Sequence, residues 1–198
     1  MKVTLIDKNV NGINTVIQAL SLCRDKQCTE TTVDHCLTEK PVPHLSALEF
    51  VWFVFEVDGL SVKARIQQLR HRLASTMERS TRAIDMSDCT FVVPPTAKHP
   101  ERFIERYEQI RRMYTNAISE GETKEDASYL LPLATSTRFT WAVNGRVAFE
   151  YLQKRLCRKH VQAEHYKLAA EIYRQLVKEI PQLRYAHPCQ YCLQCTEY

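Results

Sequence analysis

The chain has 198 residues, 44% hydrophobic and 25% charged, which is typical of a globular protein large enough to bury a core. Its net charge of +4, from 27 basic and 23 acidic residues, is too small to indicate a nucleic-acid partner. No apolar run approaches the ~20 residues of a membrane span, and the N-terminus becomes charged too soon for a signal peptide. We therefore expect a single cytoplasmic domain over residues 1–198, with no nucleic-acid or membrane partner.

The small residues and the cysteines restrict how this chain can bind a ligand. Its four glycines form neither a Gly-x-Gly-x-x-Gly nor a Walker loop. Side chains would therefore have to hold any nucleotide phosphates, and arginine has the best geometry for that. A Cys-rich tail at 187–198 carries Cys189, Cys192 and Cys195. That spacing suits zinc, but without a partner Cys-x-x-Cys a free or simply packed tail fits about as well, and we assign no metal.

The first half of the chain mixes strands and helices. Alternation over residues 2–6 predicts a strand, and the almost wholly apolar residues 50–57 predict a buried one. Gly59 is expected to turn the chain before a helix over 62–70, capped by Ser61. Helices are also predicted over 13–22 and 31–38, and residues 71–84 are expected to be irregular or strand-like.

The second half is mostly helical. A short strand is predicted at 91–93, followed by a long amphipathic helix over 100–120 and another that starts at Thr123. Residues 135–143 read as a strand, and two helices follow, over about 144–157 and 161–180. The fold class is therefore α+β, with a modest sheet flanked by long helices.

A concentrated basic segment is the strongest functional signal. It is Arg70-His71-Arg72, with Ser75, Ser80 and Arg82 shortly after it. Scattered arginines are usually solvated surface charges. Here three of them, with a histidine and hydroxyls, follow an apolar helix-like run, which favours an anionic ligand such as a phosphate.

This spacing resembles the signature of flavin-dependent thymidylate synthases. Other segments that resemble the family occur in the family's order and cover roughly residues 44–181. They are His44-x-Ser46-x-x-Glu49, Leu131-Pro132, Thr137-Arg138-Phe139, Asn144-Gly145-Arg146, Arg155-Leu156-Cys157 and Gln162-x-Glu164.

The resemblance implies an α+β homotetramer with active sites between subunits. It implies FAD, reduced by NADPH, and conversion of dUMP to dTMP with methylenetetrahydrofolate as the carbon donor. The residues that would hold the flavin are His44, Ser46, Arg70, His71, Arg72, Glu78, Asn144, Arg146 and Glu150. The residues that would hold the nucleotide are Gln67, Gln68, Leu69, Arg70, Glu78, Arg79, Ser80, Thr81, Arg82, Ser128 and Arg155.

Arg155 is the expected catalytic residue, because the resemblance matches it to an arginine that stabilises ionised uracil. A fixed guanidinium can stabilise charge on the ring without losing a proton. One extra residue before Gln162 leaves Arg158 as a weaker candidate for the same role. Gln162 and Glu164 themselves fit ordinary helix-surface positions, so we leave them out of the site.

The chain departs from the family pattern near the nucleotide. Met77 and Ala83 stand where asparagine and tyrosine are usual, Ser128 replaces a nucleotide-contacting arginine, and Glu150 replaces an asparagine. Loss of the arginine at 128 removes a contact worth about 1.5–3 kcal/mol. Our hypothesis is an altered or broadened nucleotide, for example UMP, which some relatives from nucleoside-antibiotic pathways methylate. The alternative is a non-catalytic nucleotide- or nucleic-acid-binding protein that keeps the fold.

Overall fold

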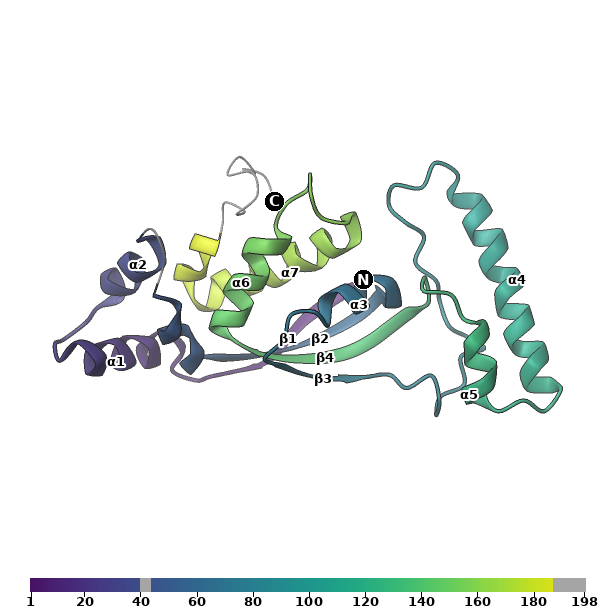
Figure 1. Cartoon of the computed structure of the whole chain (residues 1–198), viewed down its shortest axis with the longest axis horizontal. Coiled ribbons are helices and arrows are strands. Elements are labelled where there is room, and N and C mark those ends of the chain that lie inside the picture. The colour runs from purple at the N-terminus through teal and green to yellow at the C-terminus, as the bar shows by residue number, and fades with distance from the viewer. Residues whose placement is uncertain (40–43, 187–198) are drawn as a thin grey trace.

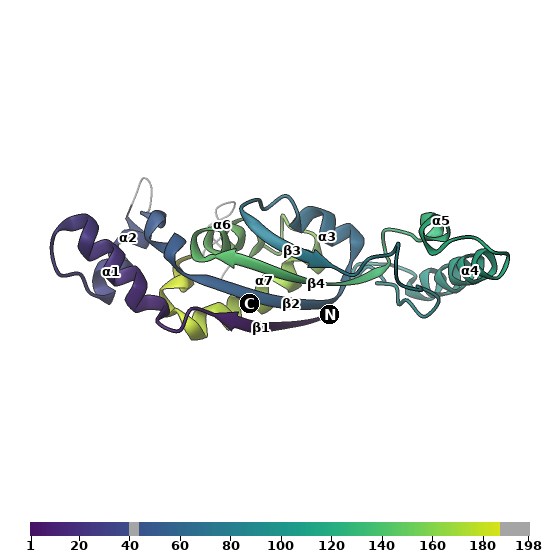
Figure 2. The same ribbon diagram turned by 90° about the horizontal axis from the view of Figure 1, so that it is seen from below.

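A four-stranded antiparallel sheet forms the centre of the molecule. The structure is a computed structural model, and it describes residues 1–39 and 44–186. The strand order is β1-β2-β4-β3, as Figure 2 shows from the side of the bare sheet face. The strands are β1 (Lys2–Lys8), β2 (Trp52–Ser61), β3 (Ala74–Glu78) and β4 (Ser136–Asn144). The five-residue β3 forms one edge and pairs with β4 alone.

Helices cover one face of this sheet (Figure 1). They are α3 (Val62–Gln68), α6 (Gly145–Arg155) and α7 (Ala163–Glu179). The alternating pattern of β2 explains this, because Phe53, Phe55 and Val57 are buried while the residues between them are at least partly exposed. No helix of the described residues covers the other face. The predicted α+β class, a modest sheet with long helices, is confirmed.

Two helical groups extend the molecule at opposite ends of the sheet (Figure 1). One group contains α1 (Gly12–Arg24), α2 (Glu30–Thr38) and the 3₁₀ helix η1 (Leu45–Phe50). The other contains α4 (Pro100–Ser119), α5 (Lys124–Ala127) and η2 (Ser128–Leu130), with a small core of its own around Tyr114 and Met86. A last 3₁₀ helix, η3 (Pro181–Ala186), follows α7.

Side-chain caps fix the starts of the helices nearest the sheet. The Ser61 hydroxyl accepts from the Ala64 amide at 3.1 Å, which confirms the predicted cap of α3. The Asn144 side chain accepts from the Val147 amide at 2.9 Å and starts α6 directly after β4. These caps set the directions in which α3 and α6 leave the sheet.

Some predicted element boundaries are wrong. Gly59 does not turn the chain: with φ +85° it lies inside β2, where a bulge between Asp58 and Leu60 lets the strand continue to Ser61. The expected strand at 91–93 is reduced to a single bridge between Phe91 and Thr135. The buried strand begins at Trp52 and not at residue 50, because η1 occupies the preceding residues. The predicted helix over 62–70 ends at Gln68.

Across residues 1–39 and 44–186, no helix has both the length and the apolar character needed to cross a membrane. The cysteines of the predicted tail, Cys189, Cys192 and Cys195, lie outside the described residues.

Candidate functional site

Five of the eleven residues predicted to hold the nucleotide line one groove. Beyond the end of β3, residues Glu78 to Arg82 line a hollow of about 440 Å³, together with Thr135 to Thr137 of the β4 side. The Arg79 amide donates to the Arg138 carbonyl at 2.9 Å, so the pairing with β4 continues one residue past the strand. Ser80, Thr81 and Arg82 are thereby presented at the edge of the sheet.

Ser128 does not line this groove; it is the first residue of η2, directly after α5. Arg82 forms an exposed ion pair with Glu125 of α5, with 2.8 Å between Nε and Oε1. The Ser128 hydroxyl donates to the Glu125 carbonyl at 2.6 Å. Ser128 therefore lies near Glu125, whose carboxylate pairs with Arg82, and its side chain adds no positive charge there.

Several residues predicted to hold the flavin gather at the other end of β3. Asn144, Arg146 and Glu150 line a hollow of about 620 Å³ with Trp52 and residues 73–75. Arg146 contacts two carboxylates, Glu49 at 2.6 Å and Glu150 at 3.1 Å. Hydrogen bonds to Glu49 and then Glu150 raise the pKa of Arg146. Its charge is thus already compensated by the chain itself.

Leu73 also lines this hollow and has an unusual backbone. Its φ is 62° and its side chain is 81% exposed, a left-handed conformation that costs a leucine roughly 1 kcal/mol or more. The exposed His44 and Ser46 do not line the hollow; Ser46 lies on η1, three residues before Glu49.

A third group lies at the end of α6. The Arg155 Nε donates to the His71 Nε2 at 2.9 Å. Burial, followed by the charges of Arg155, Lys154 and Arg70, lowers the pKa of His71 to about 4. His71 is therefore neutral at pH 7 and accepts this bond, with its proton on Nδ1. The terminal nitrogens of Arg155 make no hydrogen bond within the described residues, so its bidentate face remains available.

Two buried side chains lie beside His71. Its ring packs edge-on against Tyr151, with centroids 4.8 Å apart, and lies 6.4 Å from the ring of His165. Burial, with the charges of Arg155 and His71, lowers the pKa of His165 to about 3. Both ring nitrogens of His165 and the Tyr151 hydroxyl are buried without a hydrogen-bond partner in the described part of the chain.

The remaining predicted residues divide by exposure. Leu69, Arg70 and Arg72 are exposed, and neither arginine pairs with a carboxylate of residues 1–39 or 44–186. Gln67 donates to the Gln162 side chain at 2.8 Å. Gln68 is buried and accepts from Arg65, so its side chain faces the protein and not a groove.

Sequence reasoning missed two buried charged residues. Arg65 is 2% exposed and pairs with Glu78. Glu164, expected on a helix surface, is instead 6% exposed, and its carboxylate accepts from the Ser61 amide and hydroxyl, each at 2.6 Å. That expectation was wrong because a residue of the first turn of α7 reaches the first turn of α3. The Gln-x-Glu resemblance was the signal that pointed to it.

The predicted site residues do not form one cleft within a single chain. The two hollows lie at opposite ends of β3, whose five residues span about 13 Å. A larger hollow, of about 770 Å³, runs along α7 and contains Arg158 but no residue from either predicted set. Arg158 stacks over Tyr166 at 5.3 Å, whereas Arg155 contacts His71, so the geometry favours Arg155 of the two candidates.

Comparison with known proteins finds relatives over most of the chain. The family described as thymidylate synthase complementing protein matches residues 4–182. A flavin-dependent thymidylate synthase of Clostridium tetani is 27% identical over 95% of this chain and 87% of its own length. The enzyme of the same name from Geobacter sulfurreducens is 32% identical over 69% of this chain and 61% of its own length. A third flavin-dependent thymidylate synthase, that of Pyrococcus furiosus, is 31% identical, but the match spans only 51% of its length.

The match over residues 4–182 includes both hollows, the His71–Arg155 pair and every residue of the two predicted sets. The order of motifs that suggested the family is therefore confirmed at the level of the whole chain. This chain belongs to the thymidylate synthase complementing protein family, whose relatives named above are flavin-dependent thymidylate synthases.

Proposed function

We propose that this chain is a flavin-dependent methylating synthase that acts on a uridylate, converting dUMP to dTMP. Methylenetetrahydrofolate would supply the carbon and reduced FAD the hydride, with NADPH as the reductant. The observation that carries the proposal is Arg155, bonded through Nε to a neutral His71 with its terminal nitrogens unpaired.

The residues present fit a flavin nucleotide. The hollow of about 620 Å³ is within the usual size of ligand sites, ~300–1,000 Å³. Trp52, Leu73 and Val147 provide apolar walls, and the Asn144 side chain marks the start of α6. Arg70 and Arg72 are exposed and unpaired with described carboxylates, so they can meet phosphates that Arg146, already paired, cannot. When bound, the flavin would supply hydride chemistry that no side chain offers.

Arg155 would act on the pyrimidine. Carbon 5 of uracil is a weak nucleophile, and a guanidinium beside the ring stabilises the negative charge that makes it stronger. Neutral His71 orients Arg155 without competing for its charge. Ser80 lines the nucleotide groove, so we assign its hydroxyl to nucleotide binding and not to attack.

A complete site would require more than one chain. The hollows are separated by the length of β3, and no helix of residues 1–39 or 44–186 lies over one face of the sheet. We therefore propose a homotetramer in which the flavin hollow of one chain meets the nucleotide groove of another.

The nucleotide could be UMP as well as dUMP. Ser128 replaces the expected arginine, and Arg82 is paired with Glu125, so less positive charge faces the phosphate than the resemblance implies. We propose that this altered groove broadens the accepted sugar.

The deciding experiment supplies purified protein with methylenetetrahydrofolate, NADPH and FAD, plus either dUMP or UMP, and analyses the products by mass. Methylated dUMP is expected, with methylated UMP if the groove is broadened. An enzyme that ignores UMP removes the broadened-nucleotide proposal. A colourless protein that does not bind FAD and forms no product would contradict the proposed synthase function. A gel shift with RNA or DNA would then favour the alternative, a non-catalytic binding protein.

A further inference from the structure

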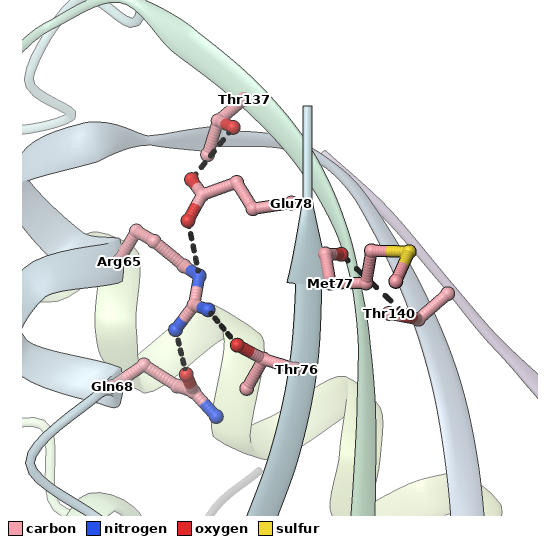
Figure 3. A network of polar contacts seen from close by, with 7 residues as sticks. All are labelled: Arg65, Gln68, Thr76, Met77, Glu78, Thr137 and Thr140. Carbon is pink, nitrogen blue, oxygen red and sulfur yellow. Dashed lines mark hydrogen bonds and ion pairs between the residues drawn. The ribbon is translucent and has the colours of Figure 1, made fainter. Parts of the chain in front are cut away.

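The segment that carries Arg70, His71 and Arg72 is held at both of its ends by a single buried residue, Arg65. Figure 3 shows the guanidinium of Arg65 between α3 and β3. One terminal nitrogen donates to Gln68, just before the segment, and the other donates to Thr76 at 2.9 Å, just after it. The intervening loop, residues 69–75, is thus closed at its base by one side chain.

The third nitrogen of Arg65 is directed to Glu78. Its Nε lies 3.3 Å from Oε2, while the other carboxylate oxygen accepts from Thr137 of β4 at 2.8 Å (Figure 3). Each oxygen of Glu78 therefore has a protein partner, which fixes the plane of the carboxylate. Glu78 also lines the nucleotide groove, so this geometry presents it there in one orientation.

Such burial of a charge needs compensation. Arg65 is 2% exposed, and burial lowers its pKa; an unpaired buried charge is strongly destabilising. The Phe139 ring lies 4.1 Å beneath the guanidinium and adds a cation–π contact. The guanidinium is thus held by one ion pair, two hydrogen bonds and the ring, although Nε lies near Glu78 without making a hydrogen bond. Lysine's compact ammonium group cannot reproduce this set of contacts.

We propose that Arg65 is a positioning residue: it closes the loop 69–75 and orients Glu78 in the nucleotide groove without touching the ligand itself. This role rests on the proposed function for its effect on catalysis, but its structural part can be tested without any ligand.

The first test is hydrogen exchange of the ligand-free full chain, measured by mass spectrometry. Arg65→Met keeps an unbranched apolar stem and removes all three polar contacts, so exchange over 69–78 should rise at least tenfold while α4 stays unchanged. Arg138→Met is the matched control, because Arg138 bonds Glu56 from the same sheet but is exposed. It should leave residues 69–78 unchanged.

The second test measures the KM for dUMP. Arg65→Met and Glu78→Gln should each raise it about tenfold at similar flavin content, and the double variant should be no worse than either. If Arg65→Met does not fold, Arg65→Lys replaces it as the test variant. Lysine keeps the ion pair with Glu78, so the KM for dUMP should change less than threefold, while hydrogen exchange over residues 69–75 should still rise.

The proposal is overturned if hydrogen exchange over residues 69–78 is unchanged in the variant that folds. It is also overturned if the effects of Arg65→Met and Glu78→Gln on KM multiply in the double variant. Wild-type protein that forms no methylated product would contradict the proposed function instead, and the exchange data would then decide on Arg65 alone.

Discussion

Arg155 makes the sharpest prediction about activity. Replacing Arg155 with alanine removes the group placed to stabilise the uracil anion, so methyl formation should fall at least ~10²-fold, the usual cost of one charge-stabilising donor. Flavin content should change little, because Arg155 does not line the flavin hollow. The measurement is product mass over time beside the absorbance spectrum. Arg158→Ala, three residues away and stacked on Tyr166, is the control, and wild-type rates in Arg155→Ala would remove it from the mechanism.

The neighbouring histidines predict how stability depends on pH. The folded pKa values of His71 and His165 are lowered to about 4 and about 3, below the ~6.5 of an unfolded histidine. The unfolded chain therefore binds more protons as pH falls below about 6.5, so their contribution to stability is complete above that pH. It is lost progressively toward pH 4, at up to about 1 kcal/mol per pH unit for each histidine.

His165→Leu tests this assignment. It removes two buried ring nitrogens that have no partner among the described residues, so it should raise the free energy of unfolding at pH 5 and reduce the slope between pH 6 and 4. Urea titrations at several pH values measure both. An unchanged slope would mean that acid loss of stability comes from other groups.

Arg65 and Gln68 show what the residue pattern could not reveal. Ile66 and Leu69 belong to the apolar run that drew attention to the arginine segment, yet each is 48% exposed. The buried face of α3 carries Ala64, Arg65 and Gln68 instead. A helix of seven residues has too few turns for apolar spacing to fix its inner face. The Arg65 side chain is held by Gln68 of the same helix and by Thr76 and Glu78 of β3.

Contacts between elements also decide how α3 begins. The Glu164 carboxylate bonds the amide and hydroxyl of Ser61, the cap of α3. Glu164→Ala leaves these groups buried without partners, which should lower the free energy of unfolding by about 1–3 kcal/mol. Denaturant unfolding measures it. Glu171→Ala, on the same helix and in an exposed ion pair with Arg174, should stay within about 0.5 kcal/mol. Equal losses in the two variants would contradict the anchoring role of Glu164.

Helices and strands with a clear period were predictable, and those decided by pairing were not. The long helix from Pro100 and the strand ending at Asn144 each carry their own apolar pattern. Residues 91–93 have the composition of a strand, but their pairing is limited to the bridge between Phe91 and Thr135 and one hydrogen bond from the Val92 amide to the Ala134 carbonyl. Gly59 has the composition of a turn, but a bulge absorbs its positive φ. Neighbouring strands, and not local preference, determined both outcomes.

The arrangement of the site depends on how elements far apart in the sequence come together. Motif order identified the family and several of the residues that line the two hollows, because their spacing is local. It could not show that Asn144 and Arg146 would lie at one end of β3 and Ser80 and Arg82 at the other. Which grooves meet depends on surfaces far apart in sequence.

The bare face of the sheet therefore carries the last prediction. On β2, Val54 points to the side opposite the buried Phe53 and Phe55 and is half-buried, and no described helix covers it. If chains assemble through this face, Val54→Glu should lower the molar mass in light scattering from that of four chains and abolish methyl formation, since buried carboxylates repel and are costly to desolvate. Leu22→Glu, an equal change on the exposed side of α1, should preserve both. A wild-type protein that runs as one chain and still forms product would show that one copy closes the site alone.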